Sequence, residues 1–365
     1  MKQIVVASNM YPSEKHPTYG IFVRNQVELL RANGVDVTVL ANANPDKGKV
    51  NLLRKYAGWF FRYMKYVSAN RKNISVVHAH YIFPTGVLAM LSKKLWNIPY
   101  AVTAHGGDLD QMPSKSPMIR NLTAKILKNA DEVIVVGEAL KENALALQPI
   151  PEDRLHIISM GVDTEIFRPL PASETMGLPV TAEGPAILYV GNIIRAKGLL
   201  ELADAFKEVQ KNFPEAALYL IGSRKDTAFT EKLNNKIGEL GLQNVHFIDP
   251  QPQAEINRWM NAADVLVLPS HIEGFGLVAL EAMAAGVPVV GSEVGGLKFL
   301  LAEKRGVLFV KGDHEGLAAG IQAVLTNKET HLDKEKIQEA VQEHSFSTIA
   351  AKLLRLYKGM GSSND

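Results

Sequence analysis

The sequence predicts an α/β protein built from two Rossmann-like, doubly wound domains that face each other across a cleft. Its 365 residues exceed what one simple core buries, and its hydrophobic share of 47% is typical of a globular protein. Short apolar runs alternate with amphipathic helical patterns, which is the rhythm of βαβ units. This rhythm stops once, in a proline-rich segment between Asp163 and Pro185, and then begins again.

The first half of the chain contains six short apolar runs that we interpret as buried strands. Their apolar residues follow one another without clean alternation, as expected of parallel strands covered on both faces. The runs are Ile4–Ala7, Val35–Leu40, Ser75–His80, Tyr100–Thr103, Glu132–Val136 and Leu155–Ile158. Helical patterns lie between them, for example at Phe22–Ala32, Gly86–Lys94 and Pro117–Lys128. These elements predict a first domain over residues 1–165.

The second half repeats this rhythm and ends in a helix. Its strand-like runs are Ile187–Val190, Ala217–Ile221, Val245–Ile248, Val265–Leu268, Val287–Val290 and Val307–Val310. They predict a second domain over residues 175–344. The amphipathic pattern at 345–359 predicts a final helix, which we expect to pack back on the first domain. The polar tail Gly361–Asp365 is expected to fray.

The composition excludes several classes of protein. The chain has no cysteine, which rules out disulfides, thiolate metal sites and cysteine nucleophiles. No apolar run approaches the roughly 18–20 residues of a membrane-spanning helix. The apolar start Ile4–Ala7 is shorter than the core of a signal peptide and is interpreted as a first strand. We therefore expect a soluble, cytoplasmic protein.

Positive charge gathers in the first half of the chain. Residues 1–165 contain 20 Lys and Arg against 14 Asp and Glu, a net charge of +6 in a chain whose total is +2. Much of the excess lies in residues 47–72, where eight basic residues are interleaved with aromatic ones, among them Trp59 and Phe61. Such a segment suits an anionic membrane surface or a nucleic acid, and equally an ordinary helix with a solvated basic face.

The most informative stretch runs from a strand into a glycine-rich loop and then into a helix. The first turn of a helix offers unpaired N–H groups and the positive end of a dipole, so the helix that follows Gly276 suits a diphosphate. Glu273 lies just before the glycines, and Glu281 about one turn into the helix. Because sugar hydroxyls donate hydrogen bonds, one acid can hold a ribose and the other a hexose. A plain helix start with a solvated glutamate is the simpler alternative.

A dinucleotide site is a competing interpretation of the same glycines. Gly274, Gly276 and Ala279 fit the pattern G-x-G-x-x-A, and Glu293 follows at a suitable distance. The first glycine of that pattern normally sits directly at the end of a strand. Here Pro269–Glu273 intervene, so the sequence disfavours a dehydrogenase.

Polar and glycine residues after other strands extend the predicted site. Asn192, Arg195 and Lys197 follow the first strand of the second domain. Lys197 opens a helix at the carboxyl end of that strand, where it can neutralise a leaving phosphate. The alternative is an ordinary surface lysine at the start of a helix, with no role in binding. In the first domain, Gly20 precedes a helix and either allows close approach of a ligand or serves as a turn residue.

Histidines also follow predicted strands of the first domain. The loop from His105 to Asp108 reads H-G-G-D, and a histidine beside an aspartate can bind a substrate hydroxyl. His78 and His80 share one face of a strand. No H-E-x-x-H motif or carboxylate cluster accompanies them, and the D-x-D tripeptide from Asp108 to Asp110 is a weak signal. We therefore expect no metal.

Together these motifs resemble those of family 4 glycosyltransferases of the GT-B fold, particularly bacterial enzymes of envelope and exopolysaccharide synthesis. The similarity covers nearly the whole chain. The motifs that carry it are the E-x7-E element from Glu273 to Glu281, the Lys-Gly pair at Lys197, the H-G-x-D element at His105 with its aspartate one residue late at Asp108, and the hinge GVD-x-x-x-F-x-P from Gly161 to Pro169.

The resemblance implies a retaining, metal-independent transfer of a sugar from a nucleotide-diphospho-sugar, most simply a UDP-sugar, without a cofactor. The expected donor-binding residues are Gly20, Asn192, Arg195, Lys197, Glu273, Gly274, Phe275, Gly276, Leu277 and Glu281. The expected acceptor-binding residues are His80, His105 and Asp108, and the expected catalytic residues are Glu273, Lys197 and His105. In this scheme Glu273 contacts the donor sugar, Glu281 the ribose, and Lys197 the leaving diphosphate.

The sequence departs from the family pattern near the donor. Asn192 stands where the family often has arginine, and Arg195 can supply that charge from three residues on. Lys298 stands where many relatives carry glutamate. The expected acceptor is a saccharide or a lipid-linked saccharide, with residues 47–72 in peripheral contact with an anionic membrane and no nucleic acid as partner. The alternatives are a non-catalytic nucleotide-sugar-binding protein and a sugar-nucleotide epimerase of similar fold.

Overall fold

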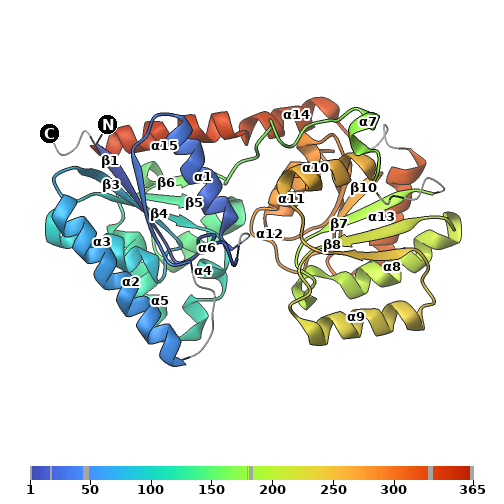
Figure 1. Cartoon of the computed structure of the whole chain (residues 1–365), viewed down its shortest axis with the longest axis horizontal. Helices are drawn as coiled ribbons and strands as arrows, with labels where there is room; N and C mark the ends of the chain where they lie inside the picture. The colour runs from blue at the N-terminus through green and yellow to red at the C-terminus, as the bar shows by residue number, and fades with distance from the viewer. Residues whose placement is uncertain are drawn as a thin grey trace. The chain divides into compact units, whose positions relative to one another are not determined.

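The computed structural model of the chain describes residues 2–16, 19–43, 49–178, 180, 184–327 and 332–361, and for residues 49–54 only the backbone. The chain forms two compact units (Figure 1). Unit 1 consists of Met1–Met160 with Phe346–Asp365, and unit 2 of Gly161–Ser345. Each unit contains a six-stranded parallel sheet. These sheets confirm the predicted α/β class with two doubly wound domains.

The sheet of unit 1 has the strand order β2-β1-β3-β4-β5-β6. Its strands are β1 (Gln3–Ser8), β2 (Val37–Ala41), β3 (Ile74–His80), β4 (Tyr100–Ala104), β5 (Glu132–Val135) and β6 (Leu155–Ile157). The longer helices among and between these strands are α1 (Ile21–Ala32), α2 (Lys49–Asn70), α3 (Thr85–Trp96), α5 (Pro117–Asn129) and α6 (Glu138–Leu147). A further helix, α4 (Gly107–Asp110), is a single turn. The strand order reverses between β1 and β3, so ligands are expected at the loops that follow these strands.

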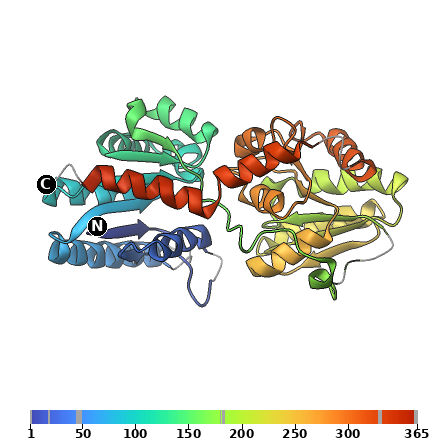
Figure 2. The same cartoon turned by 90° about the horizontal axis from the view of Figure 1, so that it is seen from above.

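The last helix of the chain, α15 (Phe346–Gly361), belongs to unit 1. Figure 2 shows it, in red, lying along this unit. Ile349, Leu353 and Tyr357 are fully buried in the same core as residues of β1. The Tyr357 hydroxyl also lies 2.6 Å from Nδ1 of His78 on β3. Gly361 ends this helix, and the rest of the tail that was expected to fray lies outside the described residues.

The sheet of unit 2 has the strand order β12-β11-β10-β7-β8-β9, which is the 3-2-1-4-5-6 order of Rossmann folds when it is read from the β9 edge. Its strands are β7 (Ala186–Val190), β8 (Ala217–Ile221), β9 (Val245–Ile248), β10 (Val265–Leu268), β11 (Val289–Ser292) and β12 (Val307–Phe309). Its helices are α7 (Ala172–Thr175), α8 (Leu199–Asn212), α9 (Thr227–Glu239), α10 (Gln253–Ala262), α11 (Leu277–Ala284), α12 (Gly295–Leu300), α13 (His314–Thr326) and α14 (Lys334–Glu343). The order reverses between β7 and β10, which are neighbours in the sheet. The loops after these two strands therefore start side by side.

The first part of the proline-rich segment is packed on unit 2. Phe167 is 1% exposed in the core of this unit. The backbone N–H of Arg168 donates to the Asn257 side chain, and that of Leu170 donates to the Asn261 side chain. Because prolines interrupt regular backbone hydrogen bonding around these residues, side-chain amides on α10 satisfy the two donors instead.

The basic and aromatic stretch forms α2, whose aromatic side chains face in different directions. Trp59 and Tyr63 are buried, and the Tyr63 hydroxyl lies 2.8 Å from that of Ser92. Phe61 is 69% exposed, and Arg62 and Lys65 are exposed beside it. Residues 47 and 48 and the side chains up to 54 lie outside the described part of the chain. Within the described part, no helix has the length and apolar character needed to cross a membrane.

Candidate active site

The loops after β7 and β10 meet at the switch point of the unit 2 sheet. The backbone N–H of His271 donates to the carbonyl of Ala196 at 2.9 Å, which ties one loop to the other. Lys197, at the end of a single 3-10 turn that begins at Arg195, places its Nζ 2.6 Å from Oε2 of Glu273. Both side chains are largely buried, with 24% and 19% of their surfaces exposed. The two residues that the sequence assigned to phosphate and sugar are thus in direct contact.

A helix N-terminus opens next to this ion pair. Gly276 precedes α11 with φ of 93°, and no side chain caps the helix. The first turn contains no acidic residue, so its positive dipole end is not neutralised locally. The four predicted residues of the glycine-rich loop, from Glu273 to Gly276, lead directly into this helix start. The arrangement suits a diphosphate anion.

A second glycine pair, which the sequence analysis did not assign to the site, supports this loop. Gly295 begins α12 with φ of 46°, and a Cβ there would lie 1.8 Å from the carbonyl oxygen of Glu273. A Cβ on Gly296 would lie 2.4 Å from backbone atoms of Phe275. The sequence signal was a Gly-Gly pair two residues beyond the end of a strand, which allows two backbones to approach closely.

Glu281 lies on α11, beyond the first turn. Burial raises the pKa of its carboxyl to about 8, and a side-chain hydrogen bond with Gln253 of α10 opposes this shift by favouring the charged form. A carboxyl in this state lacks solvation and is well suited to accept hydrogen bonds from hydroxyl groups of a ligand.

Replacing Glu281 with glutamine is expected to stabilise the unliganded protein at alkaline pH. In the folded state the carboxyl has a pKa of about 8, against 4.5 for an ordinary glutamate. Between pH 4.5 and pH 8 the folded chain therefore binds more protons than the unfolded chain does. The stability that the Glu281 carboxyl contributes below pH 4.5 is lost as the pH rises through 8. We expect the Tm of Glu281→Gln to exceed that of the wild type at pH 8 and the difference to shrink towards pH 5, measured by thermal unfolding. Glu239→Gln, at an exposed position of α9, is the control. A Tm difference that is independent of pH contradicts the assignment.

Asn192 and Arg195 share the loop of Lys197, and both are exposed. The carbonyl of Asn192 accepts a hydrogen bond from the Tyr189 hydroxyl at 2.9 Å, while the amide side chain has no hydrogen-bond partner among the described residues. Arg195 likewise has no ion-pair partner there. Lys298, the other departure from the family pattern, lies 3.3 Å from Glu293.

In unit 1, the loop after β1 ends at Gly20, immediately before α1. Gly20 has φ of 72°, and a Cβ there would lie 2.7 Å from backbone atoms of Met10. The glycine is therefore required by the packing of this loop on itself, in addition to any role towards a ligand.

Three histidines lie close together at the carboxyl ends of β3 and β4, where His78 and His80 are buried and His105 is partly buried. Nε2 of His78 lies 2.7 Å from the Thr103 hydroxyl, and Nδ1 of His80 lies 3.1 Å from Nε2 of His105. Burial lowers the pKa of His78 and of His105 to about 3 and that of His80 well below its ordinary value, so all three rings are neutral near pH 7. Nε2 of His80 is buried without a hydrogen-bond partner among the described residues.

Asp108 holds the loop that carries His105. Its side chain is buried, and its carboxylate accepts hydrogen bonds from the backbone N–H groups of Ile82, His105 and Gly106 at 2.9, 3.0 and 3.0 Å. These hydrogen bonds to the backbone fix the position of the loop at His105. The contact of Asp108 itself with an acceptor stays a prediction.

Asp110, the second aspartate of the D-x-D tripeptide, accepts a hydrogen bond from Asn143 at 2.6 Å. Within the described ranges, no group of three or more His, Asp and Glu side chains has the geometry to hold a metal ion. The residues that the sequence singled out thus gather in two places, the loops around Lys197 in unit 2 and those around His105 in unit 1.

Comparisons with known proteins match this architecture. A family model described as "Glycosyltransferase Family 4" matches residues 20–166, and one described as "Glycosyl transferases group 1" matches residues 178–343. A D-inositol 3-phosphate glycosyltransferase of Thermobispora bispora is 31% identical over 304 residues, which are 77% of this chain and 70% of that protein. A putative teichuronic acid biosynthesis glycosyltransferase of Bacillus subtilis is 25% identical over 87% of this chain and 88% of its own length.

Solved structures share the fold. A sucrose-phosphate synthase from Thermosynechococcus elongatus has a TM-score of 0.82 at 24% identity, with all of both chains covered. HepE from Anabaena in complex with UDP has a TM-score of 0.79 at 19% identity, over 98% of this chain and all of that one. The fold and the sequence matches define a two-domain GT-B glycosyltransferase. The chain belongs to glycosyltransferase family 4.

Proposed function

We propose that the chain is a retaining glycosyltransferase that moves a sugar from a UDP-sugar to a saccharide or lipid-linked acceptor in envelope polysaccharide or glycoconjugate synthesis. The observation that carries the proposal is the Lys197–Glu273 ion pair beside the N-terminus of α11, at the switch point of the unit 2 sheet. A lysine and an uncapped helix start suit a diphosphate, and the adjacent carboxylate suits sugar hydroxyls.

In this proposal the residues of unit 2 act on the departing diphosphate. The bond between the anomeric carbon and the diphosphate oxygen breaks, and the negative charge that develops there is stabilised by Lys197 and by the N–H groups that follow Gly276. Glu273 holds the sugar through its hydroxyl groups. The acceptor hydroxyl attacks the same face and gives its proton to the leaving phosphate, so the anomeric configuration is retained without a dedicated base. His105 in unit 1, neutral near pH 7, is a hydrogen-bond partner for the acceptor.

Names of similar proteins support the donor and widen the choice of acceptor. HepE structures are described with UDP and with UDP-glucose, which favours a uridine nucleotide. Several relatives are named D-inositol 3-phosphate glycosyltransferases, and another is assigned to teichuronic acid synthesis. A small phosphorylated polyol therefore belongs beside saccharides and lipid-linked saccharides in an acceptor screen.

A thermal-shift panel of UDP-, GDP- and ADP-sugars tests the donor. A ligand that binds only the folded state raises its stability, by about 2.7 kcal/mol at a hundredfold excess over Kd. We expect a rise in Tm with UDP-sugars alone, followed by transfer to an acceptor with retention, read from the anomeric proton coupling by NMR. Binding without transfer or hydrolysis indicates a non-catalytic binding protein, and product formed without any acceptor indicates an epimerase.

Sugar transfer is expected to survive EDTA. The proposed stabilisation of the leaving diphosphate comes from Lys197 and the start of α11, and a metal ion is not part of it. Initial rates with and without the chelator should agree within error. Loss of activity on chelation that Mn²⁺ or Mg²⁺ restores contradicts the proposal and makes Asp108 and Asp110 candidate ligands.

The proposal includes peripheral membrane contact through α2. Phe61, Arg62 and Lys65 are exposed on neighbouring positions, where cations attract anionic lipid by roughly 1 kcal/mol each and an aromatic ring can enter the headgroup region. We expect sedimentation with anionic but not neutral vesicles, reduced by salt and by Arg62→Glu with Lys65→Glu. Lys94→Glu, at an exposed position of α3, is the control. Absence of binding to anionic vesicles at low salt contradicts the membrane contact.

A further inference from the structure

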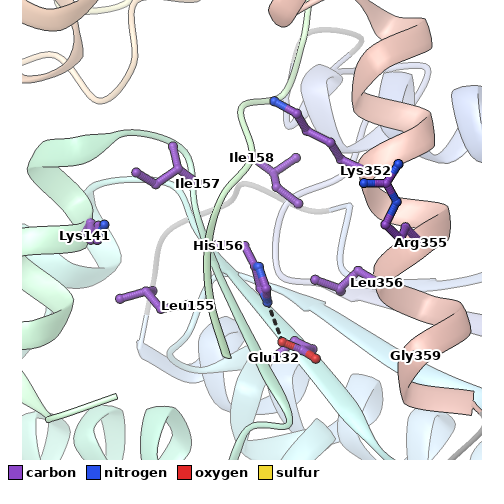
Figure 3. Close-up of a pocket in the computed structure, with 10 residues that line it drawn as sticks. All are labelled: Glu132, Lys141, Leu155, His156, Ile157, Ile158, Lys352, Arg355, Leu356 and Gly359. Carbon is purple, nitrogen blue, oxygen red and sulfur yellow. Dashed lines mark hydrogen bonds and ion pairs between the residues drawn. The ribbon is translucent and has the colours of Figure 1, made fainter. Parts of the chain in front are cut away.

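Unit 1 contains a cavity of about 530 Å³ along the outer edge of its sheet (Figure 3). It lies over the edge strand β6, with Lys141 of α6 on one side and α15 on the other. None of the residues assigned above to sugar transfer lines it. The cavity is therefore a separate feature of unit 1.

Cationic side chains enter this cavity from both sides of the strand. Lys352 and Arg355 come from one face of α15, and Lys141 comes from α6. The one carboxylate among the lining residues, Glu132, is engaged by His156, whose Nε2 lies 2.6 Å from Oε2 of the glutamate. Neither Lys141 nor Arg355 has an ion-pair partner in the described part of the chain. The cavity thus carries net positive charge.

The backbone of the edge strand adds a donor. The N–H of Ile158 donates to the carbonyl of Val135 on β5. Because the backbone groups of successive residues in a parallel strand point to opposite sides, the N–H of Ile157 is directed to the open edge, where no strand formed by the described residues continues this sheet. Leu155 and Leu356 supply apolar surface beside these polar groups.

We propose that this cavity binds a phosphate or diphosphate group. Two cations without carboxylate partners, together with Lys352, favour an anion that carries more than one negative charge. The planar guanidinium of Arg355 matches the paired oxygens of a phosphate, and the backbone N–H of Ile157 is a further donor to such an oxygen. The apolar surface beside the cations allows the phosphate to be that of a free small molecule or of a lipid-linked one.

Lysine acetylation followed by mass spectrometry tests the site in the intact chain. Inorganic pyrophosphate is expected to slow the acetylation of Lys141 and Lys352 about tenfold when about nine sites in ten are filled. The exposed Lys94 of α3 should react at an unchanged rate. Arg355→Gln should abolish the protection, whereas Arg120→Gln, at an exposed position of α5, should keep it. Protection of Lys197 in the same samples reports separately on the donor site, so failure of the two proposals is distinguishable.

Farnesyl diphosphate and farnesol identify the source of the phosphate. Protection by farnesyl diphosphate at lower concentration than by pyrophosphate assigns a lipid-linked ligand, and equal protection assigns a free one. The inference is overturned if pyrophosphate leaves Lys141 and Lys352 unprotected, if it protects Lys94 equally, if farnesol protects as well as its diphosphate, or if Arg355→Gln behaves as Arg120→Gln does.

Discussion

Replacing Lys197 with alanine is expected to lower the turnover number of sugar transfer by about 10²–10³-fold. The ammonium group lies 2.6 Å from Glu273, three residues before the N-cap Gly276 of α11 and beside the position proposed for the diphosphate, whose charge grows as the bond to the sugar breaks. An interaction that strengthens in the transition state affects kcat more than donor affinity. Steady-state kinetics and donor titration of Lys197→Ala should therefore show a large loss in kcat with a smaller change in Kd. Wild-type kinetics would remove Lys197 from the mechanism.

The ion pair with Glu273 requires its own controls. Loss of Lys197 leaves the Glu273 carboxylate, 19% exposed, with the Ser270 hydroxyl at 3.3 Å as its remaining hydrogen-bond donor among the described side chains. Part of the effect can thus arise from an unpaired acid, and the double variant with Glu273→Gln measures that coupling. Lys211→Ala removes an exposed lysine of α8, paired with Glu208, and should leave kcat unchanged. Equal losses in the two lysine variants would point to a general charge effect.

The second large effect is expected at Gly295. An alanine there meets two costs, because φ of 46° lies in the left-handed region and its Cβ would lie 1.8 Å from the Glu273 carbonyl. The conformation costs about 1–2 kcal/mol and overpacking about 1–3 kcal/mol, so we expect a loss of about 3 kcal/mol or more in the free energy of unfolding. Since the clash displaces the loop of Glu273, donor binding should weaken as well. Urea unfolding and donor titration measure the two effects.

Gly241→Ala separates the two costs. Gly241 has φ of 62° and open space around the position of a Cβ, so it carries the conformational cost alone. Its replacement should destabilise the protein by about 1–2 kcal/mol and leave donor binding unchanged. If Gly295→Ala behaves like Gly241→Ala in both measurements, the glycine pair after β11 does not support the donor loop.

Much of the fold followed from local patterns. Runs such as Ile4–Ala7 and Val265–Leu268 have the continuous apolar character of strands covered on both faces, and the structure places them in parallel sheets. The proline-rich segment was harder to interpret, since its prolines indicated a break between two domains while Phe167 is buried in unit 2. Composition shows where regular structure ends, but it does not show which core receives a side chain from an irregular segment.

The candidate site shows the same division. The sequence by itself determined the residue types after the strands, including Lys197, Glu273 and His105, because glycine-rich loops and helix starts leave local signals. The sequence also indicated glycosyltransferase family 4, since the motifs of this family have characteristic residues and spacings. Each of these properties depends on residues that are close together in the chain.

Only the tertiary structure decided which of these residues meet. The sheet order places β7 beside β10, which brings Lys197 within 2.6 Å of Glu273 across 76 positions of sequence. It also turned Asp108 towards three backbone N–H groups, and it brought α15 back beside β6 to form a cationic cavity with α6. Contacts of this kind depend on the order of the strands in a sheet and on which helices pack against its faces and edges. These choices minimise the exposed apolar surface of a whole unit, and no local stretch of sequence contains them.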